Sequence, residues 1–213
     1  MSADASRPLV LACGALAGDL RAVLTASGFD ALIDVEYLPA HLHNHPRDIV
    51  PALEPRLRAA AAARRAVFVA YADCGTGGAL DALLAEHRGV QRLAGAHCYD
   101  VFAGALQIEA LLDAELGTFF LTDFLARHFE ALVWRGLGLD RHPELREAYF
   151  GRYRRVALLA QTPDRAVQAK ARDAAERLGL ELLELHVGRE RLAEPVLVFA
   201  RAGQAEVLDG ASR

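Results

Sequence analysis

Short hydrophobic runs alternate with longer amphipathic stretches along the first hundred residues. The hydrophobic runs have the length and the unbroken apolar character of buried strands. These strands are predicted at 8–12, 31–39, 66–72 and 90–95. The stretches between them repeat their apolar residues at helical spacing, and they are predicted as helices at 16–28, 47–65 and 78–87. The pattern is that of repeated strand–helix–strand units.

The middle of the chain has a different pattern, and the last third resumes the first one. Helices are predicted at 99–115 and 122–136, on either side of a short extended piece at 116–121. A strand at 153–161, a helix at 164–179 and a strand at 180–188 follow. After Gly188 the composition fits a strand and a helix equally, and the tail from Gln204 is expected to be loose.

Strands that alternate with helices indicate an α/β protein with a mostly parallel sheet. Continuous apolar strands such as 66–72 are typical of a sheet covered on both faces. We therefore expect a three-layer, doubly wound fold in a single domain over 1–213. The helical stretch 99–150 suggests a division into two lobes, 8–150 and 151–200.

Composition narrows the class of protein. Hydrophobic residues make up 53% of the chain, which is enough for a sizeable core, and the net charge is -4, which does not favour nucleic acid as a partner. No run reaches the ~18 apolar residues of a membrane helix, and the N-terminus lacks the basic region of a signal peptide. We expect a cytoplasmic protein. Its three cysteines cannot all pair with one another, so free thiols or metal ligands are the expected states.

All three cysteines follow predicted strands. Cys13, Cys74 and Cys98 come after the first, third and fourth strands, and the carboxyl ends of parallel strands meet at one edge of a sheet. A helix begins after each of them, and a helix N-terminus favours thiolate. Three thiolates with His97 would form a soft-metal site, with zinc first among the candidates. A single reactive cysteine and inert packing remain open as alternatives.

Histidines and carboxylates near these cysteines extend the candidate set. His41, His43 and His45 alternate after the second strand, and residues that alternate in an extended segment share one face. His43 is the member expected at the site, and the alternative is a polar loop before a helix. Asp73 and Asp100 are the candidate catalytic residues, which would act by orienting the metal ligands.

The glycines after Cys74 form the remaining candidate motif. Gly75, Gly77 and Gly78 resemble a nest of backbone N–H groups that faces an anion, so they are candidate cofactor-binding residues. The segment lacks the lysine of a nucleotide-binding P-loop, and the first strand is not followed by the glycine spacing of a dinucleotide site. A nucleotide site is therefore a minor option.

Several motifs together resemble a known family. LACGAL, LHNHP, YADCGTGG, GAHCYDVFAG, LGTFFLTDFLARHF, LGLDRHPEL and YRRVALLAQT occur in this order between Pro8 and Gly188. They are similar to the bacterial branch of the domain-of-unknown-function family sixteen-thirty-eight. The resemblance carries no established activity. It implies a gene context of corrinoid proteins and corrinoid-dependent methyltransferases, and hence a part in one-carbon metabolism of small methylated amines.

Three functions follow as hypotheses. The first is a metal-dependent enzyme or component of corrinoid-linked methyl transfer that acts on a small molecule. The second is a non-catalytic module that binds a corrinoid, a folate or a partner methyltransferase; the usual corrinoid-binding motif DxHxxG is absent from the chain. The third is a metal-free enzyme with Cys74 as nucleophile and His97 as base. Corrinoid proteins and methyltransferases are the expected partners, and apolar helices with short edge strands are compatible with a homodimer.

Overall fold

The computed structural model describes residues 7–211, and side chains as far as residue 204. Residues up to Val101, together with those from Arg189 onward, form one compact unit, and Phe102–Gly188 form a second. The sequence pattern favoured a division near residue 150 instead. The boundary lies earlier because the strand at 118–122 pairs with the strand at 155–160 and so belongs with the last third of the chain.

The first unit is built on a four-stranded sheet. Its strands are β1 (Leu9–Cys13), β2 (Asp34–Leu38), β3 (Val67–Ala70) and β4 (Gln91–Arg92). Their order is β2-β1-β3-β4, and every neighbouring pair is parallel. β1 and β3 lie in the middle and are buried along their whole length, which explains why their sequences are continuously apolar.

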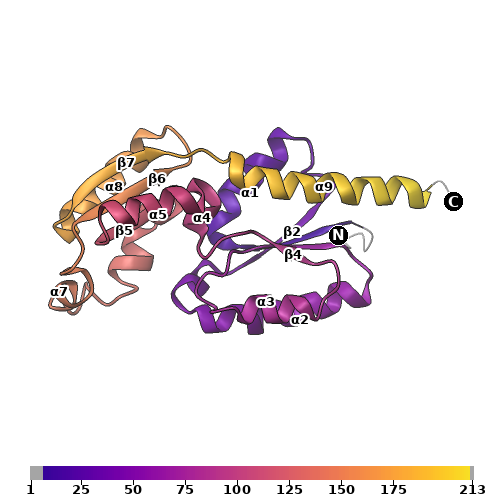
Figure 1. Ribbon diagram of the computed structural model, residues 1–213, viewed down its shortest axis with the longest axis horizontal. Coiled ribbons are helices and arrows are strands. Elements are labelled where there is room, and N and C mark those ends of the chain that lie inside the picture. Colours follow the sequence, from indigo (N-terminus) through magenta and orange to yellow (C-terminus); the bar gives the residue numbers. More distant parts are fainter. Residues whose placement is uncertain (1–6, 212–213) are drawn as a thin grey trace. The chain divides into compact units, whose positions relative to one another are not determined.

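Helices cover both faces of this sheet. They are α1 (Ala17–Ala26), α2 (Ile49–Ala62), α3 (Ala79–Ala85) and α9 (Glu190–Ala211). α1 packs against α9, and α2 packs against α3. Figure 1 shows the first pair on one side of the sheet and the second pair on the other. The expected three-layer, doubly wound α/β arrangement is confirmed in this unit.

The segment after Gly188, which the sequence left open between strand and helix, is helical. α9 begins at Glu190 and continues to Ala211, through the tail that was expected to be loose, with Pro195 inside it. Arg189 stands just before α9, and its Nε donates a 2.5 Å hydrogen bond to Oδ1 of Asp19, a buried residue of α1. This ion pair joins the returning chain to the first unit.

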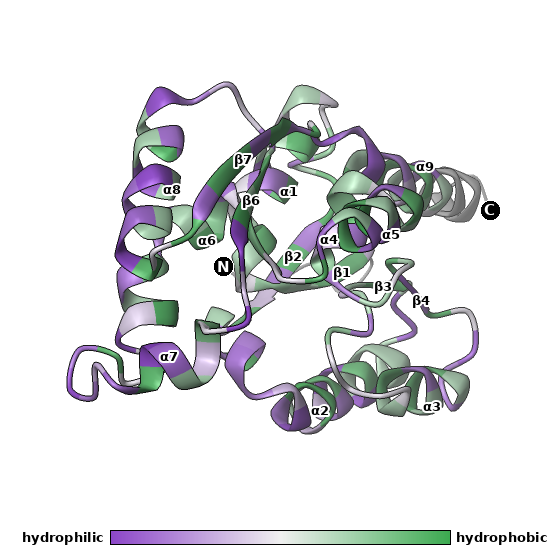
Figure 2. Ribbon diagram, turned by 60° about the vertical axis from the view of Figure 1, so that its left-hand side comes forward, coloured by the Kyte–Doolittle hydropathy of each residue, from purple (hydrophilic) through white to green (hydrophobic). Residues whose placement is uncertain are grey.

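The second unit contains a three-stranded parallel sheet. Its strands are β5 (Thr118–Thr122), β6 (Arg155–Ala160) and β7 (Glu181–His186), in that order. Its helical segments are α5 (Ala105–Ala114), α6 (Asp123–Arg127), the π-helical turn η4 (Glu130–Trp134), α7 (Leu145–Phe150) and α8 (Arg165–Leu178). α6 and α8 pack on each other and on the sheet. In Figure 2, α8 carries hydrophilic and hydrophobic residues in alternation, as an amphipathic helix does.

Two features of the helices differ from the sequence-based expectation. The helix predicted at 99–115 is divided into α4 (Cys98–Ala103) and α5 by Gly104, whose φ of 86° and ψ of 143° are not helical. The helix predicted at 122–136 is replaced by the short α6, followed by the wider π-helical turn η4. Within residues 7–211, no helix combines the length and the apolar character that crossing a membrane requires.

Candidate functional site

The strand order of the first sheet defines where a ligand would bind. From β1 the chain crosses to β2 on one side, and it later crosses from β3 to β4 on the other side. The loops that follow β1 and β3 therefore leave the sheet in opposite directions. In open parallel sheets, the crevice at such a switch point, beyond the carboxyl ends of the strands, is the usual ligand-binding place.

Two of the three cysteines flank this switch point, and the third is brought to it by the next loop. Cys13 is the last residue of β1, and Cys74 follows β3. The N–H of Cys74 donates to the carbonyl of Ala96 at 2.7 Å, and the N–H of Asp73 donates to Gly95 at 3.1 Å. These bonds hold the loop after β3 against the segment that leads to Cys98 at the start of α4. The three predicted thiols are thus brought together.

The thiols lie close enough for the charge on one to affect the pKa of another, and this coupling acts against thiolate. Burial is the largest cause that raises the pKa of each thiol, and negative charge on the other cysteines raises the pKa of Cys74 and Cys98 further. The pKa of Cys74 rises to about 12. The expectation that helix N-termini would lower these pKa values is wrong. The helical segments that follow Cys13 and begin at Cys98 have only three and six residues, and desolvation outweighs them.

The backbone at Cys74 is unusual for a residue with a side chain. Its φ is 51°, in the left-handed region that costs a non-glycine residue about 1–2 kcal/mol. Gly75 follows with a φ of 81°, and a Cβ added to it would lie 3.3 Å from Cγ of Pro46. The loop after β3 is therefore held tightly against the loop after β2. Backbone strain such as that at Cys74 is concentrated at functional sites in other proteins.

Asp73 organises the glycine turn that follows Cys74. Its Oδ1 accepts from the Thr76 hydroxyl at 2.7 Å and from the Gly78 N–H at 2.9 Å, and its Oδ2 accepts from the Gly77 N–H at 3.1 Å. The bonds to Thr76 and Gly78 lower the pKa of Asp73. The nest predicted from the glycines thus exists, but the anion in it is the chain's own carboxylate. A catalytic role for Asp73, and a cofactor at Gly75, Gly77 and Gly78, stay predictions.

The three predicted histidines do not share one face, because their backbone is helical and not extended. His41, His43 and His45 lie in and just after the 3-10 helix η2 (Ala40–Asn44), so the shared face expected of an extended segment does not form. Of these three histidines, His43 is half-buried and the other two are exposed. Burial lowers its pKa, and the charge of His97 lowers it further, so it is neutral near pH 7 and close to His97. Neutral imidazole is the form that binds metals.

Asp100 shapes the turn that presents His97 and Cys98. Its Oδ2 accepts from the N–H of Ala96 at 2.7 Å and from the N–H of His97 at 3.1 Å. A Cβ on Gly95 would lie 2.6 Å from the Cβ of Asp100, so the turn requires glycine there. His97 itself is exposed. Asp100 therefore positions a candidate ligand segment, and its catalytic role stays a prediction.

Tyr71 is a residue of the site that sequence reasoning missed. It follows β3 directly and is 2% exposed, so in the sequence it resembles one more apolar residue of the strand. Burial is the largest cause that raises the pKa of its hydroxyl, and the charges of the nearby Cys13 and Cys74 raise it further. Even so, among the described side chains this hydroxyl is the buried polar atom that has no hydrogen-bond partner of normal geometry.

The four predicted metal ligands, Cys13, Cys74, His97 and Cys98, lie in neighbouring segments without forming a preassembled centre. Across the described part of the chain, no set of three or more His, Cys, Asp or Glu side chains is placed to hold a metal ion as it stands. Binding a metal here would require the thiol side chains to turn toward a common point.

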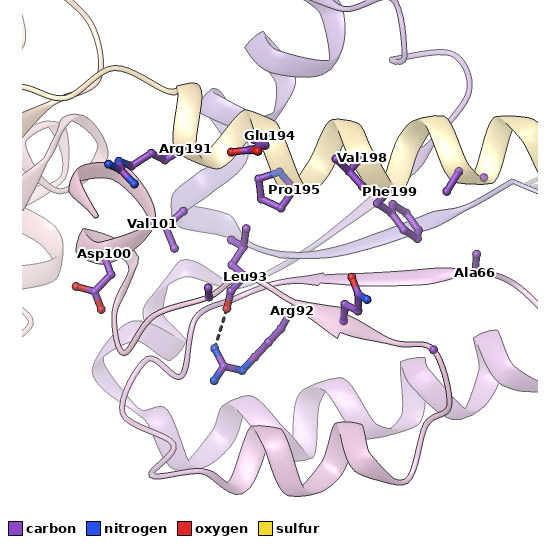
Figure 3. Close-up of a pocket in the computed structure, with 15 residues that line it drawn as sticks. Ala66, Arg92, Leu93, Asp100, Val101, Arg191, Glu194, Pro195, Val198 and Phe199 are labelled. Atoms are coloured by element: carbon purple, nitrogen blue, oxygen red, sulfur yellow. Dashed lines mark hydrogen bonds between the residues drawn. The ribbon is translucent and has the colours of Figure 1, made fainter. Parts of the chain in front are cut away.

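A cavity lies elsewhere in the same unit. It has a volume of about 720 Å³ and runs between the β4 edge of the sheet and α9, with Leu93, Pro195 and Phe199 in its wall. Figure 3 shows α9 on one side of this cavity and the segment after β4 on the other. Of the predicted site residues, Asp100 alone lines it. The thiol cluster is the candidate site, because the cavity wall brings none of the thiols or histidines together.

Comparison with known proteins gives one match. A model of the family described as "Protein of unknown function (DUF1638)" matches residues 37–195. This range includes Cys74, His97 and Cys98, and it begins after Cys13. No curated protein and no solved structure matches the chain.

Proposed function

The chain belongs to the DUF1638 family of proteins of unknown function, and on this premise we propose that its thiol cluster binds a soft divalent metal ion, with zinc first. Cys13, Cys74 and Cys98 would be the sulfur ligands. The observation that carries the proposal is the convergence of all three cysteines of the chain on the switch point of the sheet.

The coupling between the thiols favours a metal over a metal-free nucleophile. A nucleophilic cysteine needs thiolate near neutral pH, and burial raises the pKa of all three thiols. Negative charge on the other cysteines raises the pKa of Cys74 and Cys98 further. A divalent cation placed among the sulfurs removes that repulsion and lets the thiols lose their protons on binding. The elevated pKa values are therefore a property of the cluster without its cation.

Histidine would supply the fourth ligand. His97 precedes Cys98 in the chain, and His43 lies close to His97 with a pKa that keeps it neutral. Asp100 accepts from the N–H of His97 and so fixes the backbone that carries this candidate ligand. Asp73 does the same for the turn after Cys74.

We place the metal site in corrinoid-linked one-carbon metabolism of small methylated amines, which is the context that the family resemblance implies. Zinc with an open coordination position holds a thiol as thiolate or polarises a leaving group. The protein would be a metal-dependent methyltransferase or its accessory, working with a corrinoid protein or methyltransferase. Free thiols require a reducing compartment, which fits the cytoplasmic location expected from the sequence.

A binding module is the second candidate function. His43 is half-buried and neutral, and a neutral imidazole in a crevice can coordinate the cobalt of a corrinoid. In this role the chain would hold a corrinoid, a folate or a partner methyltransferase without catalysing a reaction.

Titration of the reduced, metal-free protein with Co²⁺ tests the proposal. We expect thiolate-to-metal charge-transfer absorption that saturates near one equivalent in the wild type. It should be lost in Cys74→Ser and retained in Lys170→Ala, a control in α8 of the second unit. Saturation without sulfur-to-metal bands would contradict the thiolate site.

The second candidate function is tested by adding a corrinoid to the wild type and to His43→Ala and recording the visible spectrum of the corrinoid.

A further inference from the structure

One buried hydroxyl group in the first unit lacks the partner that buried hydroxyl groups normally have. Tyr71 is 2% exposed, and no group in the described residues makes a normal hydrogen bond with its Oη. Leaving a buried polar group without a hydrogen-bond partner destabilises a fold. Such groups are rare, and each requires an explanation, of which an absent ligand is one.

The position of Tyr71 shows which part of the molecule the hydroxyl faces. The residue lies between the end of β3 and Cys74, and its hydroxyl interacts with the sulfur of Cys13 and with the charge of Cys74. A thiol is a weak hydrogen-bond acceptor, so its contact with Cys13 does not satisfy the hydroxyl. The unsatisfied donor therefore lies at the thiol cluster, beside the sulfurs of Cys13 and Cys74.

We infer that Tyr71 is a ligand-contacting residue, whose hydroxyl donates a hydrogen bond to an anionic sulfur or oxygen atom of a small molecule bound at the thiol cluster. This inference rests on the proposed function, because the metal would hold the same anionic atom. A phenol suits the task because it donates a hydrogen bond without adding charge to a buried site.

The geometry restricts the class of ligand. The acceptor atom must reach a buried hydroxyl beside two sulfurs, so it belongs to a slim group at the end of a molecule. A thiolate and a carboxylate are both slim, anionic end groups, and both bind zinc. 2-Mercaptoethanol and acetate are the simplest probes for the two cases.

Tyr71→Phe removes the hydroxyl and retains the ring, and Tyr153→Phe in the second unit is the matched control. Tyr153 packs its ring against Phe119 and Phe150, far along the chain from the cysteines. The first measurement is the free energy of unfolding of the reduced, metal-free proteins. We expect Tyr71→Phe to be as stable as the wild type or more stable. A loss of stability that exceeds the loss in Tyr153→Phe would show a structural partner for the hydroxyl and overturn the inference.

The second measurement is probe binding by calorimetry, with and without one equivalent of Co²⁺ on the protein. We expect one of the two probes to bind the wild type, and its affinity to fall at least about tenfold in Tyr71→Phe, which is the cost of losing a hydrogen bond to an anion. Co²⁺ itself should bind both proteins equally.

The outcomes separate the inference from the proposed function. Failure of the wild type to bind Co²⁺ would contradict the metal site, while probe binding that depends on Tyr71 without metal would still support the inference. If neither probe binds under either condition, or if wild type and Tyr71→Phe bind equally, the inference is wrong. The identity of the probe that binds decides between a sulfur and an oxygen ligand.

Discussion

At the scale of single residues, a thiol at the start of a helix is subject to two opposing influences on its pKa. The helix N-terminus favours thiolate, and burial favours the neutral thiol. The sequence shows which cysteines precede helices, but it does not show how deeply each thiol is buried. The direction of the pKa shifts could therefore not be predicted. That the cysteines are neighbours could be predicted, because each follows a strand of a parallel sheet. Tyr71 was missed for a related reason. The absence of a partner for its hydroxyl is a property of the folded site, and its sequence environment is that of a strand.

The raised pKa of Cys74 predicts a loss of stability in alkaline solution. The pKa rises from 9.0 to about 12 on folding, so the stability that the neutral thiol confers is fully present below pH 9.0 and is lost as the pH rises toward 12. Cys74→Ser does not titrate in this range. We expect the free energy of unfolding of the reduced, metal-free wild type to fall more steeply between about pH 8 and about pH 10.5 than that of the variant. The free energy of unfolding is measured by urea denaturation at each pH. Equal dependence on pH in the wild type and the variant would refute the assigned shift.

At the scale of elements, alternation of apolar runs with amphipathic stretches was sufficient to predict the parallel strands and most helices. The failures have local physical reasons. Gly104 adopts backbone angles that divide one predicted helix in two, and composition after Gly188 did not distinguish strand from helix. Strand pairing also lies beyond periodicity: the short extended piece at 116–121 is the edge strand β5 of a separate sheet.

The close approach of the loops after β1 and β2 gives a prediction for this scale. A Cβ on Gly14, the residue after Cys13, would lie 2.8 Å from the carbonyl oxygen of Leu38 and 3.1 Å from the N atom of Ala40. Backbone atoms cannot move aside cheaply, so we expect Gly14→Ala to destabilise the fold by about 1–3 kcal/mol. Gly18 in α1 has nothing within 4 Å of its added Cβ, and Gly18→Ala should stabilise by up to about 1 kcal/mol. Chemical denaturation measures both, and equal effects would contradict this account of the loops.

At the scale of the whole molecule, the chain leaves its first unit after Val101 and returns to it at Arg189. The helical pattern at 99–150 signalled a division of the chain, but it did not show that the second unit is inserted into the first, because both units are built from strand–helix units. The sequence therefore predicted the class of fold correctly, but not that its strands are distributed over two sheets. All residues of the candidate thiol site belong to the first unit.

The ion pair between Arg189 and Asp19 joins residues 170 positions apart and anchors the return of the chain. Asp19 is 6% exposed, so we expect Arg189→Gln to destabilise the protein by about 1–3 kcal/mol. Asp19→Asn and the double variant complete a cycle that isolates the coupling between the two residues. Additive effects of the two substitutions on the free energy of unfolding would show that the pair contributes nothing as a pair.

Elemental analysis of protein purified without an affinity metal tests the central claim most directly. The account predicts about one zinc or other soft metal ion per chain in the wild type, and loss of that metal in both Cys13→Ser and Cys74→Ser. Freshly reduced wild type that contains no metal, and takes up none when zinc is supplied, would contradict it.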